Sequence, residues 1–221
     1  MALFAIGDVH GCLNALEAVV KAAGIQRNDT IVLLGDVISK GPDSRGVVQW
    51  ILDHSGYFTF IVLRGNHEDM MLKLMNGGEG EAEWMRKGGK EVLKSYETSF
   101  VPGWEKFIPE SHKKLLNPTR RYWKYGPFIF VHAGVEPEIP LEVQDDFTLF
   151  WKKFRNPVEY APGVQVIYGH TALKNGLIAD FGHSLCLDTY AYGGQWLSCF
   201  NVQTRRFWQA NENQQVRSGR L

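Results

Sequence analysis

Histidine, aspartate and asparagine recur in glycine-rich turns along this chain. Each turn follows a short apolar run, and its polar residue stands next to or near a glycine. The turns are residues 7–11 (GDVHG), 35–36 (GD), 65–68 (GNHE), 131–134 (VHAG) and 168–171 (YGHT). Carboxylate and imidazole groups together suit divalent transition metals such as manganese, iron or zinc better than calcium. The turns therefore predict a metal centre.

The candidate ligands are too many for one four-coordinate ion. They are Asp8, His10, Asp36, Asn66, His132 and His170. Asp8 and His10 are two residues apart, so in extended backbone their side chains project to one side. The surplus favours two ions bridged by a carboxylate such as Asp36, an arrangement that clamps a phosphoryl group and activates water in two-metal hydrolases. His67, next to Asn66, is then free to act as general acid on the leaving oxygen.

A purely structural explanation competes with this hypothesis at each turn. An Asp-x-His turn is commonly a capping feature, and a buried histidine at a strand end is commonly only hydrogen-bonded. Joint occurrence favours the metal, because four of the seven histidines lie in these turns. The other three, His54, His112 and His183, receive no functional assignment.

Hydrophobic periodicity predicts the elements that position the turns. We expect strands at residues 2–6, 30–34 and 58–63 and helices at 13–23 and 46–54. These strand–turn–helix units indicate a largely parallel α/β arrangement. In such folds ligands gather at the carboxyl ends of the strands, which is where the turns stand.

The second half of the chain changes character twice. Residues 76–124 carry helical patterns, broken at Gly88-Gly89 and at prolines that include Pro118, and predict a helical insertion without strands. Short strands are then expected within 127–134, 164–171, 183–189, 195–202 and 205–210. They predict a second sheet, mixed or antiparallel, within a single domain over residues 1–210. Residues 211–221 read as a polar tail that frays.

Composition narrows the class of protein. The chain has 221 residues, 24 basic and 24 acidic, so no charge excess points to nucleic acid or a membrane surface. Three cysteines at unrelated spacings indicate reduced thiols. Neither a signal peptide nor an apolar run long enough to span a membrane is present, so a soluble cytoplasmic protein is expected. The oligomeric state stays open.

The ordered motifs GDVHG, GD, GNHE, HAG and GHT resemble the phosphoprotein phosphatase branch of the calcineurin-like metallophosphoesterases. The resemblance runs from Phe4 to about Ala210 and is strongest to small bacterial Ser/Thr protein phosphatases, which are similar to bacteriophage lambda phosphatase. Residues 83–89 (EWMRKGG), 130–135 (FVHAGV) and 187–189 (LDT) support it. The fold implied is a four-layer αββα sandwich, two mixed sheets flanked by helices, with a helical insertion.

The resemblance also implies roles for the candidate residues. It assigns Asp8, His10 and Asp36 to one metal ion, and Asp36, Asn66, His132 and His170 to the other. A metal-bound hydroxide attacks phosphorus in line, and His67 protonates the departing alkoxide. Arg64 matches an arginine that holds phosphate oxygens. The implied cofactors are two divalent ions, expected to be Mn²⁺, with iron or zinc as alternatives.

The chain departs from the family pattern at two phosphate-binding positions. The family's second motif is Gly-Asp-x-Val-Asp-Arg-Gly, whereas this chain has Ser39 and Lys40 in place of the second Asp and the Arg. A family arginine after the HAG motif corresponds to Lys153 in the stretch FWKK. Lysine keeps the charge but lacks the bidentate fork of arginine, so the geometry of phosphate recognition should weaken.

The loss of the second Asp bears on the general acid. A carboxylate beside His67 would raise its pKa and keep the imidazolium available, whereas Ser39 can accept a hydrogen bond but supplies no charge. Proton donation is then weaker, or matters less because the leaving group is already good, as in dinucleoside tetraphosphates, polyphosphate and aryl phosphates. Relatives that cleave diadenosine tetraphosphate also lack this Asp, and eukaryotic ApaH-like phosphatases often show a Lys-Gly-Pro turn.

Three functions follow from these observations. The whole-chain resemblance favours a Ser/Thr-type protein phosphatase that acts on phosphorylated proteins or small phosphoesters. The Ser39-Lys40 turn favours the alternative, a diadenosine tetraphosphatase or polyphosphatase that cleaves phosphoanhydride bonds. A metal-bound scaffold without activity is the third, and the intact ligand set with His67 and Arg64 speaks against it.

Overall fold

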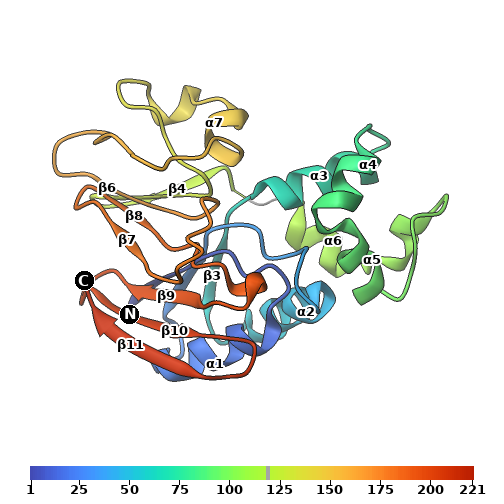
Figure 1. Ribbon diagram of the computed structural model, residues 1–221, viewed down its shortest axis with the longest axis horizontal. Helices are drawn as coiled ribbons and strands as arrows, with labels where there is room; N and C mark the ends of the chain where they lie inside the picture. The colour runs from blue at the N-terminus through green and yellow to red at the C-terminus, as the bar shows by residue number, and fades with distance from the viewer. Residues whose placement is uncertain (118–119) are drawn as a thin grey trace.

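Two mixed β-sheets pack face to face in the computed structural model, which describes residues 1–117 and 120–221 (Figure 1). The first sheet has the strand order β11-β10-β9-β1-β2-β3. Its strands are β1 (Leu3–Ile6), β2 (Thr30–Leu33), β3 (Thr59–Val62), β9 (Leu197–Asn201), β10 (Arg206–Ala210) and β11 (Val216–Arg220). The second sheet has the order β4-β5-β6-β8-β7. Its strands are β4 (Tyr122–Tyr125), β5 (Phe128–Val131), β6 (Gln165–Tyr168), β7 (Ala179–Asp180) and β8 (Ser184–Cys186).

The first sheet is parallel in one half and antiparallel in the other, whereas the second sheet has a parallel centre and two antiparallel edges. In the first sheet β1, β2 and β3 are parallel, with Phe4 opposite Ile31, while β9, β10 and β11 are antiparallel to their neighbours. In the second sheet β5, β6 and β8 are parallel, and β4 and β7 pair antiparallel at the two edges. The carboxyl ends of six parallel strands are therefore available to build one site.

Alternating side chains divide the interior into separate apolar layers. Along β1, Phe4 and Ile6 belong to the core beneath helix α1 (Leu13–Ala23), whereas Leu3 and Ala5 belong to the core between the sheets. Period-two alternation places neighbouring residues of a strand on opposite faces, so both faces of the sheet are covered.

The second sheet follows the same rule. Phe130 of β5 packs in the core between the sheets, while Ile129 packs outward against α7 (Asp146–Phe150) and the turn η3 (Leu141–Val143). The order of layers is therefore helices, sheet, sheet and a short helical layer, as the resemblance implied.

The remaining helices lie on the side of the first sheet and in the insertion. They are α2 (Ser44–His54), α3 (Asn66–Met75), α4 (Glu81–Trp84), η1 (Met85–Gly89), α5 (Lys90–Ser95), η2 (Trp104–Phe107), α6 (Glu110–Leu116) and η4 (Ala191–Gly193). The insertion, green in Figure 1, packs α5 and α6 against α2. Trp84 is fully buried within it, in ring contact with Phe100 and Trp104. The break expected at Pro118 lies outside the described residues.

Two expectations about the strands need correction. The tail was expected to fray, but Val216–Arg220 forms β11, with Val216 opposite Ala210 at the edge of the first sheet. An edge strand can be held by backbone hydrogen bonds alone. Because the side chains of β11 are mostly polar, its sequence lacks the alternating apolar residues by which strands are predicted. The region expected to lack strands reaches to residue 124 and overlaps β4, which turns through Gly126 (φ 55°) into β5. The two-residue β7 at the other edge was also not predicted.

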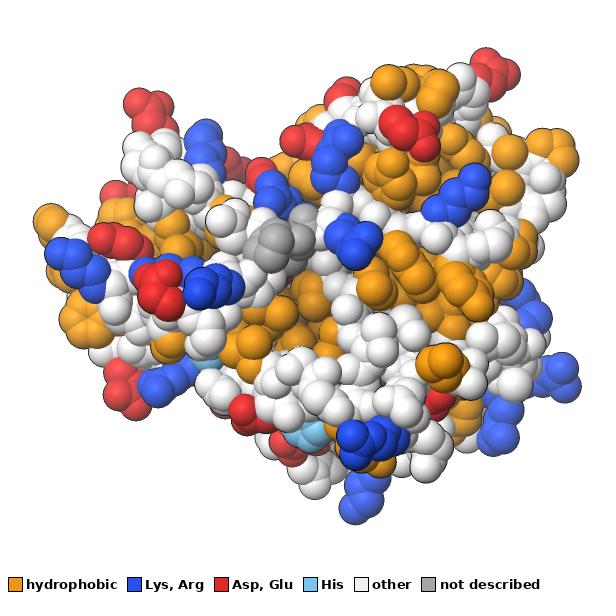
Figure 2. All heavy atoms as spheres, turned by 180° about the vertical axis from the view of Figure 1, so that it is seen from behind, with side chains coloured by type: hydrophobic (Ala, Val, Ile, Leu, Met, Phe, Trp, Pro, Cys, Tyr) orange, Lys and Arg blue, Asp and Glu red, His pale blue; other side chains and the backbone are white. Residues whose placement is uncertain are grey.

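The outer surface agrees with the balanced composition. On the face turned away from the view of Figure 1, basic and acidic side chains are interspersed with hydrophobic ones (Figure 2). Among the described residues, no helix is long and apolar enough to cross a membrane.

Candidate metal centre

The predicted turns meet where the parallel strands of the two sheets end. Asp8 and His10 follow β1, Asp36 follows β2, and Asn66 begins α3 four residues after the end of β3. His132 follows β5 and His170 follows β6 in the second sheet. All these side chains are buried except that of His170, which is half-buried. Parallel strands from two sheets thus bring together residues up to 162 positions apart in the sequence.

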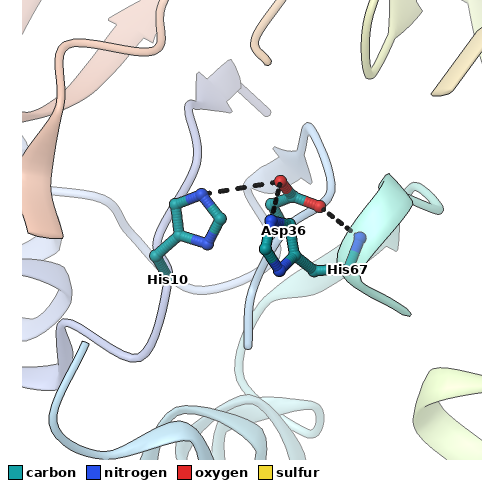
Figure 3. A group of neighbouring side chains, drawn as sticks. All are labelled: His10, Asp36 and His67. Atoms are coloured by element: carbon teal, nitrogen blue, oxygen red, sulfur yellow. Dashed lines mark hydrogen bonds and ion pairs between the residues drawn. The ribbon is translucent and has the colours of Figure 1, made fainter. Parts of the chain in front are cut away.

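Two groups of ligand atoms share one carboxylate. His10, Asp36 and His67 form one group, and Asp36, His132 and His170 form the other. The Asp36 Oδ2 atom lies 3.5 Å from Nε2 of His10 and 3.5 Å from Nε2 of His132. Figure 3 shows Asp36 between His10 and His67, with the Nε2 atom of His67 at 3.8 Å from the same oxygen. Asp36 is therefore placed as a bridge would be.

Backbone carbonyls orient the histidine rings. His10 Nδ1 lies 3.0 Å from the Ile38 carbonyl, and His132 Nδ1 lies 2.9 Å from the Leu34 carbonyl. His170 uses its other nitrogen, since Nε2 lies 2.8 Å from a backbone carbonyl of residue 151. A ring nitrogen that donates to a carbonyl leaves the opposite nitrogen as a lone pair, as in metal-binding histidines.

Burial keeps these imidazoles neutral. It lowers the pKa of His132 to about 3 and the pKa of His170 to about 3, and it lowers the pKa of His10 well below its usual value. A neutral imidazole is the form that coordinates a metal. Burial has the opposite effect on Asp36, whose carboxyl pKa it raises to about 7.

The backbone at the site is unusual for residues with side chains. His10 (φ 46°), Asp36 (φ 49°) and His170 (φ 60°) are all left-handed, and so are Ser39 (φ 77°) and Lys40 (φ 63°). Such conformations are sparsely populated for residues other than glycine and gather at functional sites. The strain is a second, independent sign that the turns serve a site.

Glu68 holds the turn that carries Asp36. Its buried carboxylate accepts hydrogen bonds from the backbone N–H groups of Asp36 (2.8 Å), Val37 (2.8 Å), Ile38 (3.3 Å) and Gly65 (2.9 Å). The carboxylate of Asp36 in turn accepts from the His67 backbone N–H at 3.0 Å. The sequence placed Glu68 in the GNHE motif but did not assign this positioning role.

The ligand set fits divalent cations by its own chemistry. His132 Nε2 lies 3.1 Å from Asn66 Oδ1, and with the ring proton on Nδ1 both atoms are acceptors. His10 Nε2 lies 3.5 Å from Asp36 Oδ2 and accepts a hydrogen bond from the Lys40 ammonium at 3.0 Å, so a positive charge already lies against these two acceptors. Converging acceptors without a shared proton are stabilised by a cation, and nitrogen with oxygen donors suits manganese, iron or zinc. Asp8 completes the set, with its carboxylate 3.9 Å from His10 Nε2.

Metal affinity should fall as the pH is lowered through about 7. Burial raises the pKa of the Asp36 carboxyl to about 7, so below that pH a proton must leave before a cation binds, while the histidines are already neutral. We expect the dissociation constant for Mn²⁺ to rise roughly tenfold per pH unit between about pH 7 and pH 6. Calorimetry in buffers of different ionisation enthalpy measures the proton released, and a pH-independent affinity without proton release would contradict the expectation.

The general acid candidate lacks the partner that was expected. The Nδ1 atom of His67 is buried without a hydrogen-bond partner among the described residues, and so is the Oγ atom of Ser39. Ser39 therefore does not replace the family's aspartate even as a neutral acceptor. Burial, followed by the neighbouring His10 and Lys40, lowers the pKa of His67 well below its usual value.

The cationic side chains are placed differently from one another. Lys40 and Lys153, for which the sequence suggested phosphate binding, both line the cavity over the centre. The Lys40 ammonium lies 3.0 Å from His10 Nε2 and 4.4 Å from the centre of the Tyr192 ring. The Arg64 guanidinium instead donates a hydrogen bond to the Asn117 carbonyl at 2.8 Å. Arg64 does not line the cavity.

The cavity also contains residues that the sequence did not single out as functional. It holds about 190 Å³, and its lining includes Lys87, Asp188 and Tyr192 beside the predicted residues. Asp188 follows β8, so it stands at the end of a sixth parallel strand. The LDT stretch carried that signal, because it repeats the pattern of an apolar strand followed by aspartate. Lys87 lies in the EWMRKGG stretch (residues 83–89) that supports the family resemblance, but the sequence analysis gave it no role.

Comparisons with known proteins show which family model and which relatives this chain matches. A family model described as calcineurin-like phosphoesterase matches residues 1–196. The chain is 35% identical over 149 residues to the zinc-dependent endopolyphosphatase of Saccharomyces cerevisiae, covering 64% of this chain and 43% of that protein. It is 25% identical over 171 residues to a symmetrical bis(5'-nucleosyl)-tetraphosphatase of Psychromonas ingrahamii, covering 77% of this chain and 57% of that protein. The chain thus spans about half the length of these relatives.

A solved structure agrees with the fold. A crystal structure provisionally assigned as a diadenosine tetraphosphatase superposes with a TM-score of 0.67 at 21% identity, covering 99% of this chain and 92% of that one. At this identity the match supports the arrangement of the two sheets alone.

Proposed function

Since the chain belongs to the calcineurin-like phosphoesterase family, we propose that it is a hydrolase of phosphoanhydride bonds, in polyphosphate or dinucleoside polyphosphates. The observation that carries this proposal is the isolated imidazole of His67, whose buried Nδ1 has no hydrogen-bond partner in the described part of the chain. The names of the endopolyphosphatase and the tetraphosphatase similar to this chain point the same way.

The ligand set would hold two divalent ions, with Asp36 as the shared ligand. Asp8 and His10 would complete the first site, and Asn66, His132 and His170 the second. Bound there, the ions would polarise the phosphoryl oxygens and activate the attacking water. Zinc is named for the yeast relative, and Mn²⁺ and iron suit the same donors. Reconstitution of the protein with each ion in turn, followed by activity measurements, identifies the ion that supports hydrolysis.

The leaving group decides which substrates the site suits. In hydrolysis, the oxygen of water forms a bond to phosphorus while the bond from phosphorus to the bridging oxygen breaks. A departing phosphate is stable as an anion, because its second pKa is about 6. A serine alkoxide is strongly basic and needs a proton as it leaves, and general acid catalysis contributes roughly 10²–10⁴-fold in such steps.

His67 is poorly equipped to give that proton. Burial lowers its pKa well below the usual value, and no carboxylate contacts its Nδ1 atom among the described residues. A neutral imidazole can orient the leaving oxygen but has no acidic proton to transfer at neutral pH. The geometry thus supports phosphoanhydride cleavage over the Ser/Thr protein phosphatase activity that the resemblance first favoured.

A substrate panel tests the proposal directly. With Mn²⁺ or Zn²⁺ supplied, we expect kcat/KM for diadenosine tetraphosphate or polyphosphate to exceed that for phosphoserine and phosphothreonine peptides by about 100-fold, because only the peptides require a general acid. Malachite green detection of phosphate and chromatography of nucleotides give the two rates. Equal or higher efficiency on the peptides would return the assignment to a protein phosphatase.

A further inference from the structure

We propose that Lys87 binds the second phosphate of a phosphoanhydride chain, next to the phosphoryl group that is attacked. The inference rests on the proposed function and deepens it, because it names a subsite that a phosphomonoester does not fill. Lys87 belongs to the helical insertion, and its side chain lines the cavity together with Lys40 and Lys153.

The helical insertion packs against the turn that carries Lys40. Gly88, directly after Lys87, has a φ of 115° and lies so close to that turn that a Cβ atom at this position would stand 2.5 Å from the Lys40 backbone nitrogen. The same atom would stand 3.0 Å from Ser39 Cβ. Only glycine accepts this approach and this backbone angle. The contact brings the backbones of Lys87 and Lys40 to the same wall of the cavity.

The Lys87 ammonium is available for a ligand. It pairs with Glu83 Oε1 at 2.8 Å and lies 4.7 Å from the centre of the Trp151 ring. The Glu83 carboxylate is half exposed, and exposed pairs of this kind contribute little to stability, so exchanging it for phosphate oxygens costs little. The Trp151 carbonyl orients His170, which sets Lys87 beside the residue that holds a predicted ligand of the second ion.

The charges of the cavity favour a ligand with more than one phosphate. The carboxylates in its lining are those of Asp8, Asp36 and Asp188, and the first two belong to the proposed metal centre. The ammonium groups of Lys40, Lys87 and Lys153 then outnumber the one remaining carboxylate of the lining, that of Asp188. The phosphoryl group that is attacked would bind the metal ions. The next phosphate along the chain carries further negative charge, which ammonium groups outside the metal centre can bind.

Binding of a substrate analogue that cannot be cleaved tests the subsite. Methylenediphosphonate, in which a methylene group replaces the bridging oxygen, is titrated calorimetrically into the metal-loaded protein and into its Lys87→Gln variant. We expect the variant to bind it about tenfold more weakly, as for loss of one charge-assisted hydrogen bond. Orthophosphate should change by less than about twofold, because it fills only the position at the metals.

Matched variants separate charge from structure. Lys90→Gln removes a lysine of the same insertion that does not line the cavity, and both affinities should stay unchanged. Lys87→Arg keeps the charge and should bind the analogue within about threefold of the unmodified protein. Thermal melts confirm that each variant is folded.

Two results would overturn the subsite. One is a Lys87→Gln variant that loses equal affinity for both anions or for neither, and the other is a Lys87→Arg variant as weak as Lys87→Gln. Failure of the proposed function has a different signature, since the unmodified protein would then leave polyphosphate and diadenosine tetraphosphate intact while the difference in analogue binding persisted.

Discussion

Replacement of Asp36 by Asn is expected to reduce kcat by about 10³-fold or more, since metal ions contribute several kcal/mol of transition-state stabilisation and each ~1.36 kcal/mol is a factor of ten. The carboxylate oxygen Oδ2 lies 3.5 Å from both His10 and His132, so it stands between the two ligand groups. An amide keeps the shape of the side chain but removes the negative charge shared by two cations. Steady-state kinetics with the preferred substrate give the loss.

Metal analysis shows whether the loss arises at the centre. We expect Asp36→Asn to bind fewer equivalents of metal than the unmodified protein after the same reconstitution, as measured by plasma mass spectrometry. Asp53→Asn, on an exposed position of α2, is the matched control and should leave activity and metal content unchanged. A variant at position 36 that retained full activity with two bound ions would exclude Asp36 as the bridge.

Replacement of Ser39 by Asp should shift the substrate preference toward phosphomonoesters. Ser39 stands where the related phosphatases carry an aspartate that orients the general acid, and the Nδ1 atom of His67 is buried without a partner among the described residues. A carboxylate there would raise the pKa of His67 and stabilise the imidazolium. We expect kcat/KM for a phosphoserine peptide to rise about 10–100-fold, while phosphoanhydride hydrolysis changes by less than about threefold.

The neutral variant Ser39→Asn separates charge from shape. It fills a similar volume, and asparagine also tolerates the left-handed backbone of this position (φ 77°), but it cannot stabilise an imidazolium. The limb of the pH–rate profile governed by His67 should move to higher pH only in Ser39→Asp. If Ser39→Asp folds normally and neither its pH profile nor its substrate preference moves, the missing carboxylate is not what determines the substrate.

The predicted ligands lie close together in the structure because their positions follow from local sequence patterns. Each lies just after a short apolar strand, and the carboxyl ends of parallel strands share an edge of a sheet. His10, Asp36 and His132 could therefore be assigned to one centre from the sequence, and the structure places the Asp36 Oδ2 atom 3.5 Å from the Nε2 atom of each histidine. Helix bounds were also close, since α1 spans the predicted residues 13–23 and α2 begins two residues before the predicted start.

Other features depend on contacts between distant segments. The polar strand β11 exists because the backbone of β10 pairs with it, and no side-chain pattern marks it. The Arg64 guanidinium lies against the Asn117 carbonyl, 53 residues further along the chain, rather than lining the cavity. Local spacing carries no information about such partners.

The sequence by itself predicted the metal-binding chemistry proposed for this protein, because residue types and turns at strand ends indicate a metal ligand set without reference to distant segments. Only the tertiary structure decided which groups surround the general acid candidate and which lysines line the cavity. It left the His67 imidazole without a partner among the described residues, and it seated Gly88 on the Lys40 turn so that Lys87 enters the cavity. Both outcomes depend on how the insertion and the two sheets pack, and packing joins residues that the chain keeps far apart.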